Sequence, residues 1–228
     1  MRTSLGTLPL EAPRGDAPAV AAFDFDGTLT YCDSLLPFLR FFCGRQRFWR
    51  QMLRLAPVFS AFRLGSISRD SAKQALLSAT VGQTPVSRLD AAARSFATDV
   101  LPALVNPAAL RRLAAHVGAG HRVLIVSASP ELYLAPWASA YGVEAVIATR
   151  LDQAGGIYTG RLLGANCRGP EKVRRLAAYL PALGAQAIYA YGDSSGDREL
   201  LAAATHPVFR GFDVSRARKV AYFARAIA

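Results

Sequence analysis

The sequence predicts an α/β protein in which helices cover both faces of a parallel sheet and a helical insert follows the first strand. Three observations predict this fold. Short apolar runs alternate with helical segments along most of the chain, which is the order that produces parallel sheets. Three of these runs end in polar residues. Finally, about 70 residues after the first run carry helical patterns but no convincing strand.

Five short apolar runs are expected to form the strands of the sheet: residues 20–23, 122–126, 145–148, 187–191 and 207–209. Continuous apolar runs of this length are typical of strands that are buried on both faces. The helices between and after the strands are expected at residues 107–117, 130–141, 170–180, 197–204 and 215–226. Pro130 and Pro170 stand where the first turn of a helix tolerates proline.

The stretch without strands suggests how the chain is divided into domains. Residues 33–105 are expected to form a helical cap, while residues 18–32 and 106–228 form the core. Residues 1–17 lack the apolar stretch of a secretion signal and are expected to be a flexible tail. The pair Gly155-Gly156 lies between apolar residues, which predicts a small hairpin.

Composition and charge exclude several classes of protein. A chain with 52% hydrophobic and 19% charged residues is not disordered. Its three cysteines include no Cys-x-x-Cys pair, so we expect neither a disulfide framework nor a zinc site. We therefore expect a cytoplasmic location. The longest uncharged run, residues 176–192, contains proline and is shorter than the roughly 20 apolar residues of a membrane span. The net charge of +11 attracts phosphates, but no nucleic-acid-binding motif accompanies it, so no nucleic acid is expected as a partner.

Polar residues follow three of the expected strands. Asp24 and Asp26 follow the first, Ser127 follows the second, and Asp193 follows the fourth. The carboxyl ends of parallel strands open into the crevice where ligands bind. Two carboxylates one residue apart point in different directions, so one can act as a nucleophile and metal ligand while the other transfers protons. Asp193 adds a further oxygen, and oxygen ligands suit Mg²⁺ (magnesium).

Four segments in this order, FDFDGTLT, LIVSAS, GPEKVRRL and YGDSSGDREL, resemble the four motifs of the haloacid dehalogenase (HAD) superfamily. The helical insert after the first motif is similar to subfamily IB, which includes phosphoserine phosphatase. The resemblance implies a Rossmann-like core and a Mg²⁺-dependent phosphatase. It implies that Asp24 is the nucleophile that becomes an aspartyl-phosphate, and that Asp26 protonates the leaving oxygen and later activates water.

The resemblance also implies roles for the other motif residues. Ser127 would bind a phosphoryl oxygen, although Ser129 could share this role, and Lys172 would neutralise the nucleophile and the phosphate. The metal ligands would be the carboxylates of Asp24 and Asp193 and the main-chain carbonyl of Asp26. The tight turn at Gly27 and Thr28 offers backbone N–H groups that can face the anion. Asp197 would be the acidic residue that supports the metal or Lys172.

The cap is where the sequence departs from phosphoserine phosphatases. Their first cap helix carries a Glu that meets the substrate amine, and the matching residue here is Asp33, which is one methylene shorter. Gln74, beside Lys73, stands near the place of their carboxylate-binding Arg. Ala128-Ser129 replaces two glycines after Ser127. These departures argue against free phosphoserine, and a small phosphorylated metabolite is the expected substrate.

A second interpretation of the cap is a membrane surface. On a helical wheel of residues 46–62, Arg47, Arg50 and Arg54 form one stripe, opposite large apolar residues, with a kink at Pro57. The apolar stripe comprises Phe48, Met52, Leu55, Phe59 and Phe62. Such a helix suits an anionic membrane interface, and a phospholipid head group, like that of phosphatidylglycerophosphate, is then an alternative substrate. The other interpretation is an ordinary cap helix with a solvated Arg face.

Overall fold

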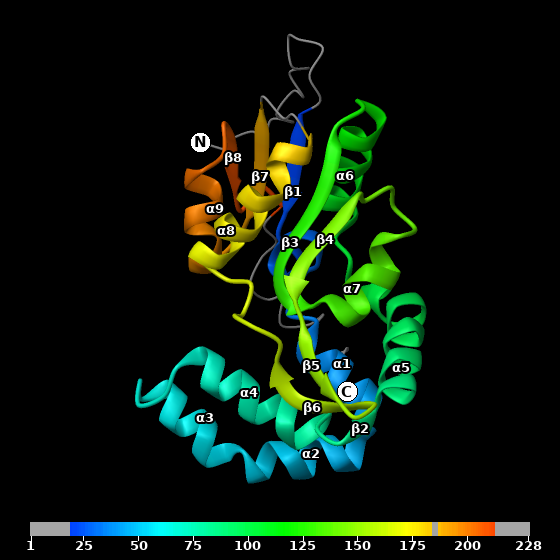
Figure 1. Ribbon diagram of the computed structural model, residues 1–228, viewed down its shortest axis with the longest axis vertical. Coiled ribbons are helices and arrows are strands. Elements are labelled where there is room, and N and C mark those ends of the chain that lie inside the picture. The colour runs from blue at the N-terminus through cyan, green and yellow to red at the C-terminus, as the bar shows by residue number, and fades with distance from the viewer. Residues whose placement is uncertain (1–18, 184–186, 213–228) are drawn as a thin grey trace, which may run out of the picture.

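The computed structural model describes residues 19–183 and 187–212, and these residues form a three-layered α/β core with helices beyond one end of its sheet (Figure 1). The expected helix at 215–226 lies outside the described residues. The five-stranded sheet is parallel throughout and has the order β4-β3-β1-β7-β8. Its strands are β1 (Val20–Phe23), β3 (Arg122–Pro130), β4 (Ala145–Thr149), β7 (Ile188–Gly192) and β8 (His206–Phe209). The parallel sheet predicted from the sequence is therefore confirmed.

Alternate residues of the strands face two separate hydrophobic layers. Val20, Ala22 and Leu124 pack on one face, where α8 (Pro170–Tyr179) and α9 (Arg198–Ala202) contribute apolar side chains. Phe23 and its neighbours pack on the opposite face, which includes residues of α6 (Pro107–Gly118) and α7 (Glu131–Ala138). All four residues of β1 are buried because the strand has neighbours on both edges and layers on both faces.

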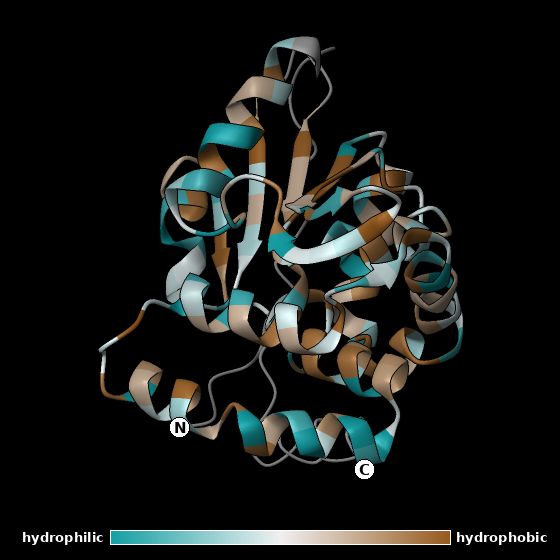
Figure 2. Cartoon of the chain, turned by 60° about the horizontal axis from the view of Figure 1, so that its bottom comes forward, coloured by the Kyte–Doolittle hydropathy of each residue, from teal (hydrophilic) through white to brown (hydrophobic). Residues whose placement is uncertain are grey.

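Apart from α6, the α-helices between β1 and β3 lie at the carboxyl ends of the strands (Figure 1). They are α1 (Leu35–Cys43), α2 (Arg45–Arg54), α3 (Ala56–Arg63), α4 (Arg69–Thr80) and α5 (Val86–Asp99). Figure 2 shows that these peripheral helices carry both hydrophilic and hydrophobic residues. We call the segment from α1 to α5 the cap helices.

A small antiparallel sheet lies beside the cap helices and has the order β2-β6-β5. The predicted hairpin forms from β5 (Leu151–Ala154) and β6 (Ile157–Leu162), and Gly155 and Gly156 both have positive φ in its turn. The sequence predicted no strand between residues 33 and 105, but β2 (Thr84–Pro85) pairs with β6. Two residues are too few to produce a detectable alternating pattern, so only the hairpin partner reveals this strand.

Two of the expected boundaries shift in the structure. The second strand was expected to end near Ser127 and the next helix to begin at Pro130, but β3 continues to Pro130 and α7 begins at Glu131. The pairing of β3 with β4 shifts register between Ser127 and Pro130. Polar residues therefore lie within the last part of β3, which carries both Ser127 and Ser129 along the edge of the site.

Candidate active site

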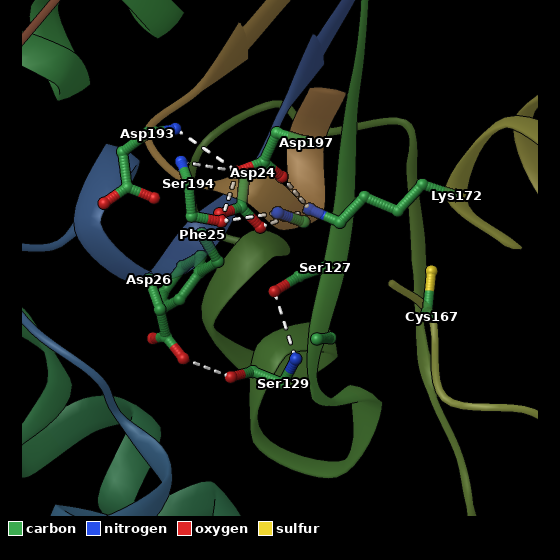
Figure 3. Close-up of polar contacts among 12 residues, drawn as sticks. Asp24, Phe25, Asp26, Ser127, Ser129, Cys167, Lys172, Asp193, Ser194 and Asp197 are labelled. Atoms are coloured by element: carbon green, nitrogen blue, oxygen red, sulfur yellow. Dashed lines mark hydrogen bonds and ion pairs between the residues drawn. The ribbon is translucent and has the colours of Figure 1, made fainter. Parts of the chain in front are cut away.

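The first part of the site is the turn that follows β1. The backbone N–H of Asp24 donates to the carbonyl of Tyr191 at 2.9 Å, which fixes the start of the turn against β7. The turn then passes through Gly27, whose φ is +79°. Figure 3 shows that the Asp24 and Asp26 side chains leave this turn in different directions, as the sequence predicted. Asp24 points toward Lys172 and Asp197, whereas Asp26 points toward Ser129.

A buried cation lies between two carboxylates at the centre of the site. Lys172, in the first turn of α8, is 2% exposed, and its Nζ lies 2.6 Å from Asp24 Oδ1 and 2.6 Å from Asp197 Oδ1. The second oxygen of Asp197 accepts from the backbone N–H of Ser194 at 3.0 Å and from its hydroxyl at 2.9 Å. Because burying a lone charge is costly, each charge here depends on the others.

The environment of these groups shifts their pKa values in opposite directions. Burial raises the pKa of Asp24 to about 6, against the attraction of the Lys172 ammonium. Burial also opposes the charged form of Asp197, but Lys172 and the Ser194 hydrogen bonds hold its pKa below the usual range. Burial disfavours the ammonium of Lys172 as well, yet the two carboxylates raise its pKa above the ordinary value. The pair of Lys172 and Asp197 therefore stays charged near neutral pH.

A cluster of carboxylates beside Lys172 fits a divalent cation. One oxygen each from Asp24, Asp193 and Asp197 lies within 4.8 Å of the others. Gly27 lets the turn approach Asp193, because a Cβ at this position would collide with the Asp193 carboxylate. Hard oxygen donors of this kind suit Mg²⁺. Both oxygens of Asp197 have protein partners, and the assignment of Asp24 and Asp193 as direct metal ligands, with Asp197 in support, stays a prediction.

Asp26 lies outside this carboxylate cluster and has its own hydrogen-bond partners. Its Oδ1 accepts from the backbone N–H of Ser34 at 3.0 Å, and its Oδ2 accepts from the Ser129 hydroxyl. The Ser34 hydroxyl in turn lies 3.0 Å from the hydroxyl of buried Tyr133. Burial and the nearby carboxylate of Asp33 raise the pKa of Asp26 well above its usual value. Asp26 is therefore placed to hold a proton, and its predicted metal contact, through the main-chain carbonyl, stays a prediction.

These groups line one cavity of about 740 Å³ between the strand ends and the cap helices. Every site residue predicted from the sequence lines it except one: Asp24, Asp26, Gly27, Asp33, Ser127, Ser129, Lys172, Asp193 and Asp197. The exception is Thr28, which is buried behind the turn; its hydroxyl has no hydrogen-bond partner among the described residues. Ser127 is buried, and its hydroxyl oxygen accepts from the Ser129 N–H at 3.1 Å.

Sequence reasoning missed a polar connection between the cap helices and the core. Lys73 on α4 donates to the carbonyl of Ala128 at 2.6 Å and to Asn166 Oδ1 at 2.8 Å. The Asn166 amide donates to Asp70 at 2.7 Å. Lys73 lines the cavity, whereas its neighbour Gln74 is exposed and does not. The match of Gln74 to the carboxylate-binding Arg stays a prediction, and the sequence around Asn166 indicates no role because its partners are distant along the chain.

Asp33 lines the cavity but already serves the start of α1. Its Oδ1 accepts from the backbone N–H groups of Leu35 and Leu36 at 3.0 and 3.2 Å. A side-chain oxygen that accepts from the first turn of a helix stabilises that helix end. The predicted contact of Asp33 with substrate therefore competes with a structural role.

The apolar stripe of residues 46–62 packs partly within the protein and partly along the cavity. The helix breaks at Leu55, next to Pro57, close to the expected kink. Phe48 and Leu55 are buried, and Phe59 and Phe62 line the cavity. This packing gives no support to membrane contact through the apolar stripe, and it favours an ordinary cap helix. Across residues 19–183 and 187–212, no helix combines the length and apolar character needed to cross a membrane.

Comparison with known proteins identifies the family. Residues 21–202 match the haloacid dehalogenase-like hydrolase family. The chain belongs to this family. This hydrolase is 38% identical over 210 residues to the protein CicA of Caulobacter vibrioides, covering 90% of this chain and 91% of CicA. It is 29% identical to the probable phosphatase Rv3661 of Mycobacterium tuberculosis, covering 87% of this chain and 71% of that protein.

The fold of this hydrolase also resembles a solved phosphatase. A substrate-bound phosphoserine phosphatase superposes with a TM-score of 0.60 at 16% identity, covering 83% of this chain and 84% of that chain. The resemblance inferred from the four motifs, the fold class and the assignment as a phosphatase-type enzyme are thereby confirmed.

Proposed function

We propose that this enzyme is a Mg²⁺-dependent phosphatase that hydrolyses a phosphate monoester of a small molecule through an aspartyl-phosphate on Asp24. The observation that carries the proposal is the arrangement of the two aspartates. Asp24 lies against the Lys172 ammonium and the carboxylate cluster, while Asp26 lies apart with a raised pKa. Asp24 is thus a carboxylate beside a positive charge, and Asp26 is a carboxyl group that can hold a proton. Phosphoryl transfer needs these two roles, a nucleophile and a general acid.

In the first step, a carboxylate oxygen of Asp24 attacks phosphorus and the bond to the ester oxygen breaks. Lys172 offsets the repulsion between the two approaching anions, and the Ser127 hydroxyl binds a phosphoryl oxygen. The bound metal would supply further positive charge at Asp24 and Asp193. Asp26 gives its proton to the departing alkoxide, so the alcohol leaves neutral and Asp26 becomes a carboxylate.

In the second step, the Asp26 carboxylate removes a proton from water, which attacks phosphorus and releases phosphate from Asp24. The hydrogen bonds from Ser34 and Ser129 hold the Asp26 carboxylate in place through both steps. These bonds also limit how far burial raises its pKa, so that the group can accept a proton as well as donate one.

The proposal is tested with Asp24→Asn and p-nitrophenyl phosphate. We expect the variant to lose measurable turnover while its circular dichroism spectrum is unchanged, because Asn lacks the nucleophilic oxygen but has the same shape. Freshly purified protein is needed, since deamidation would restore Asp. Asp99→Asn, on an exposed residue at the end of α5, is the matched control and should keep full activity.

Metal dependence is tested in the same assay. Exhaustive chelation should abolish activity and Mg²⁺ should restore it, whereas Ca²⁺ should inhibit, because Ca²⁺ takes more ligands in looser geometry and can bind both Asp24 oxygens. Near wild-type turnover by pure Asp24→Asn would refute the nucleophile. Full activity of chelated, metal-free protein would refute the metal site.

A further inference from the structure

The cavity above the catalytic residues has an apolar wall that the reaction itself does not require. Six side chains of the cap helices form it: Leu35, Leu36, Phe59, Phe62, Ala72 and Leu76. They come from α1, α3 and α4, which are separate in sequence. None of these six side chains takes part in phosphoryl transfer, so this wall is available to the rest of the substrate.

Two polar side chains of the cap that line the cavity, Asp33 and Lys73, already have hydrogen-bond partners in the protein. Asp33 accepts from the first turn of α1, and Lys73 donates to Ala128 and Asn166. The Arg69 guanidinium lies 5.6 Å from the centre of the Phe62 ring. A substrate rich in amine, carboxyl or hydroxyl groups would place those groups against apolar side chains, and unpaired polar groups in such a place are costly.

We propose that the substrate is a phosphate monoester of an apolar alcohol, whose alkyl or aryl body lies along Phe59 and Phe62 while its phosphate lies at Asp24. This inference rests on the proposed phosphatase function and names its substrate class. The volume of about 740 Å³ is within the range of roughly 300–1,000 Å³ for pockets that bury most of a drug-sized ligand. A body larger than a three-carbon amino acid therefore fits.

A series of n-alkyl phosphates tests the inference, with ethyl, butyl and hexyl phosphate kept below the concentrations at which they aggregate. Their leaving groups have nearly equal basicity, so differences in kcat/KM report binding of the chain rather than the chemical step. Each buried methylene should raise kcat/KM about three- to fourfold, and hexyl phosphate should exceed ethyl phosphate by roughly 100-fold. Phosphoserine and glycerol phosphate should be poorer substrates than hexyl phosphate.

A variant of the apolar wall links the preference to the cap. Phe62→Ser should lower the ratio of hexyl to ethyl kcat/KM by about tenfold, because it removes most of one aromatic contact. The matched control is Leu53→Ser on α2, since Leu53 is 76% exposed and does not line the cavity. This control should leave the ratio at the wild-type value.

The outcomes separate the two proposals. A flat alkyl series in the wild-type enzyme, or higher kcat/KM for phosphoserine or glycerol phosphate than for hexyl phosphate, overturns the apolar-substrate inference but leaves the phosphatase intact. Absence of hydrolysis of every ester, p-nitrophenyl phosphate included, overturns the proposed function itself. The wild-type series decides the matter even if Phe62→Ser does not fold.

Discussion

Replacing Lys172 by Met would remove the buried cation while keeping a side chain of similar length. In the metal-free protein, Asp24 and Asp197 would then face each other without the ammonium that now lies 2.6 Å from both. Breaking a buried ion pair by removing one partner costs about 3–5 kcal/mol, because the other charge is left uncompensated. We expect a loss of this size in the free energy of unfolding at pH 8.

The loss should depend on pH with a definite sign. Burial already raises the pKa of Asp24 to about 6, and removing Lys172 removes the attraction that opposes this rise. The folded variant therefore holds more protons than the folded wild type as pH falls from 8 to 5. Its destabilisation should shrink over that window by up to about 1.4 kcal/mol per pH unit for each extra proton.

Urea unfolding at pH 8 and pH 5 with a chelator present measures both effects. The matched control is Arg174→Met on the same helix: Arg174 contacts Glu171 at 2.7 Å but is exposed, so its loss should move the midpoint little. With Mg²⁺ restored, Lys172→Met should also lower kcat by about 10²–10³-fold. A wild-type midpoint at pH 8, or a destabilisation that grows as pH falls, would refute the reasoning.

Two further predictions concern single residues. Asp26→Asn should slow hydrolysis of ethyl phosphate by about 10²–10⁴-fold but that of p-nitrophenyl phosphate less, because nitrophenolate leaves without a proton; equal losses would contradict the acid role. His116 is buried 2.7 Å from His121, and burial lowers the pKa of His116 from 6.5 to about 3. The unfolded chain therefore takes up a proton first as pH falls. In urea unfolding, the wild-type free energy of unfolding should drop by about 1.4 kcal/mol more than that of His116→Gln between pH 7.5 and 5.5. Identical drops would exclude this cause.

The sheet and the polar strand ends of the candidate site were predictable because their signals are local. A strand buried on both faces must be apolar throughout, so Val20–Phe23 stands out, and the polar residues that follow it mark the open end of the sheet. The spacing of Asp24 and Asp26 predicts two directions for two carboxylates, as the structure shows. These inferences need only neighbouring residues and the rules of strand geometry.

The contacts between the cap helices and the core were not predictable in the same way. Lys73 meets Ala128 and Asn166 across 55 and 93 residues of sequence, and no periodic pattern specifies such a pairing. The two residues of β2 gain their strand conformation only from β6. The fold of each helix is a local property, whereas its packing partner depends on the whole chain.

The apolar stripe of α2 and α3 shows what this difference means for function. A helical wheel gives the polarity of a face but not what covers it, so Phe59 and Phe62 were compatible with a membrane as well as with a protein interior. α3 packs beside α4, and both rings line the cavity that also holds the candidate catalytic residues. The same residues that suggested a lipid surface then become the wall of the substrate cavity. The alkyl phosphate series measures whether this apolar wall, rather than a lipid surface, accounts for the hydrophobicity of the stripe.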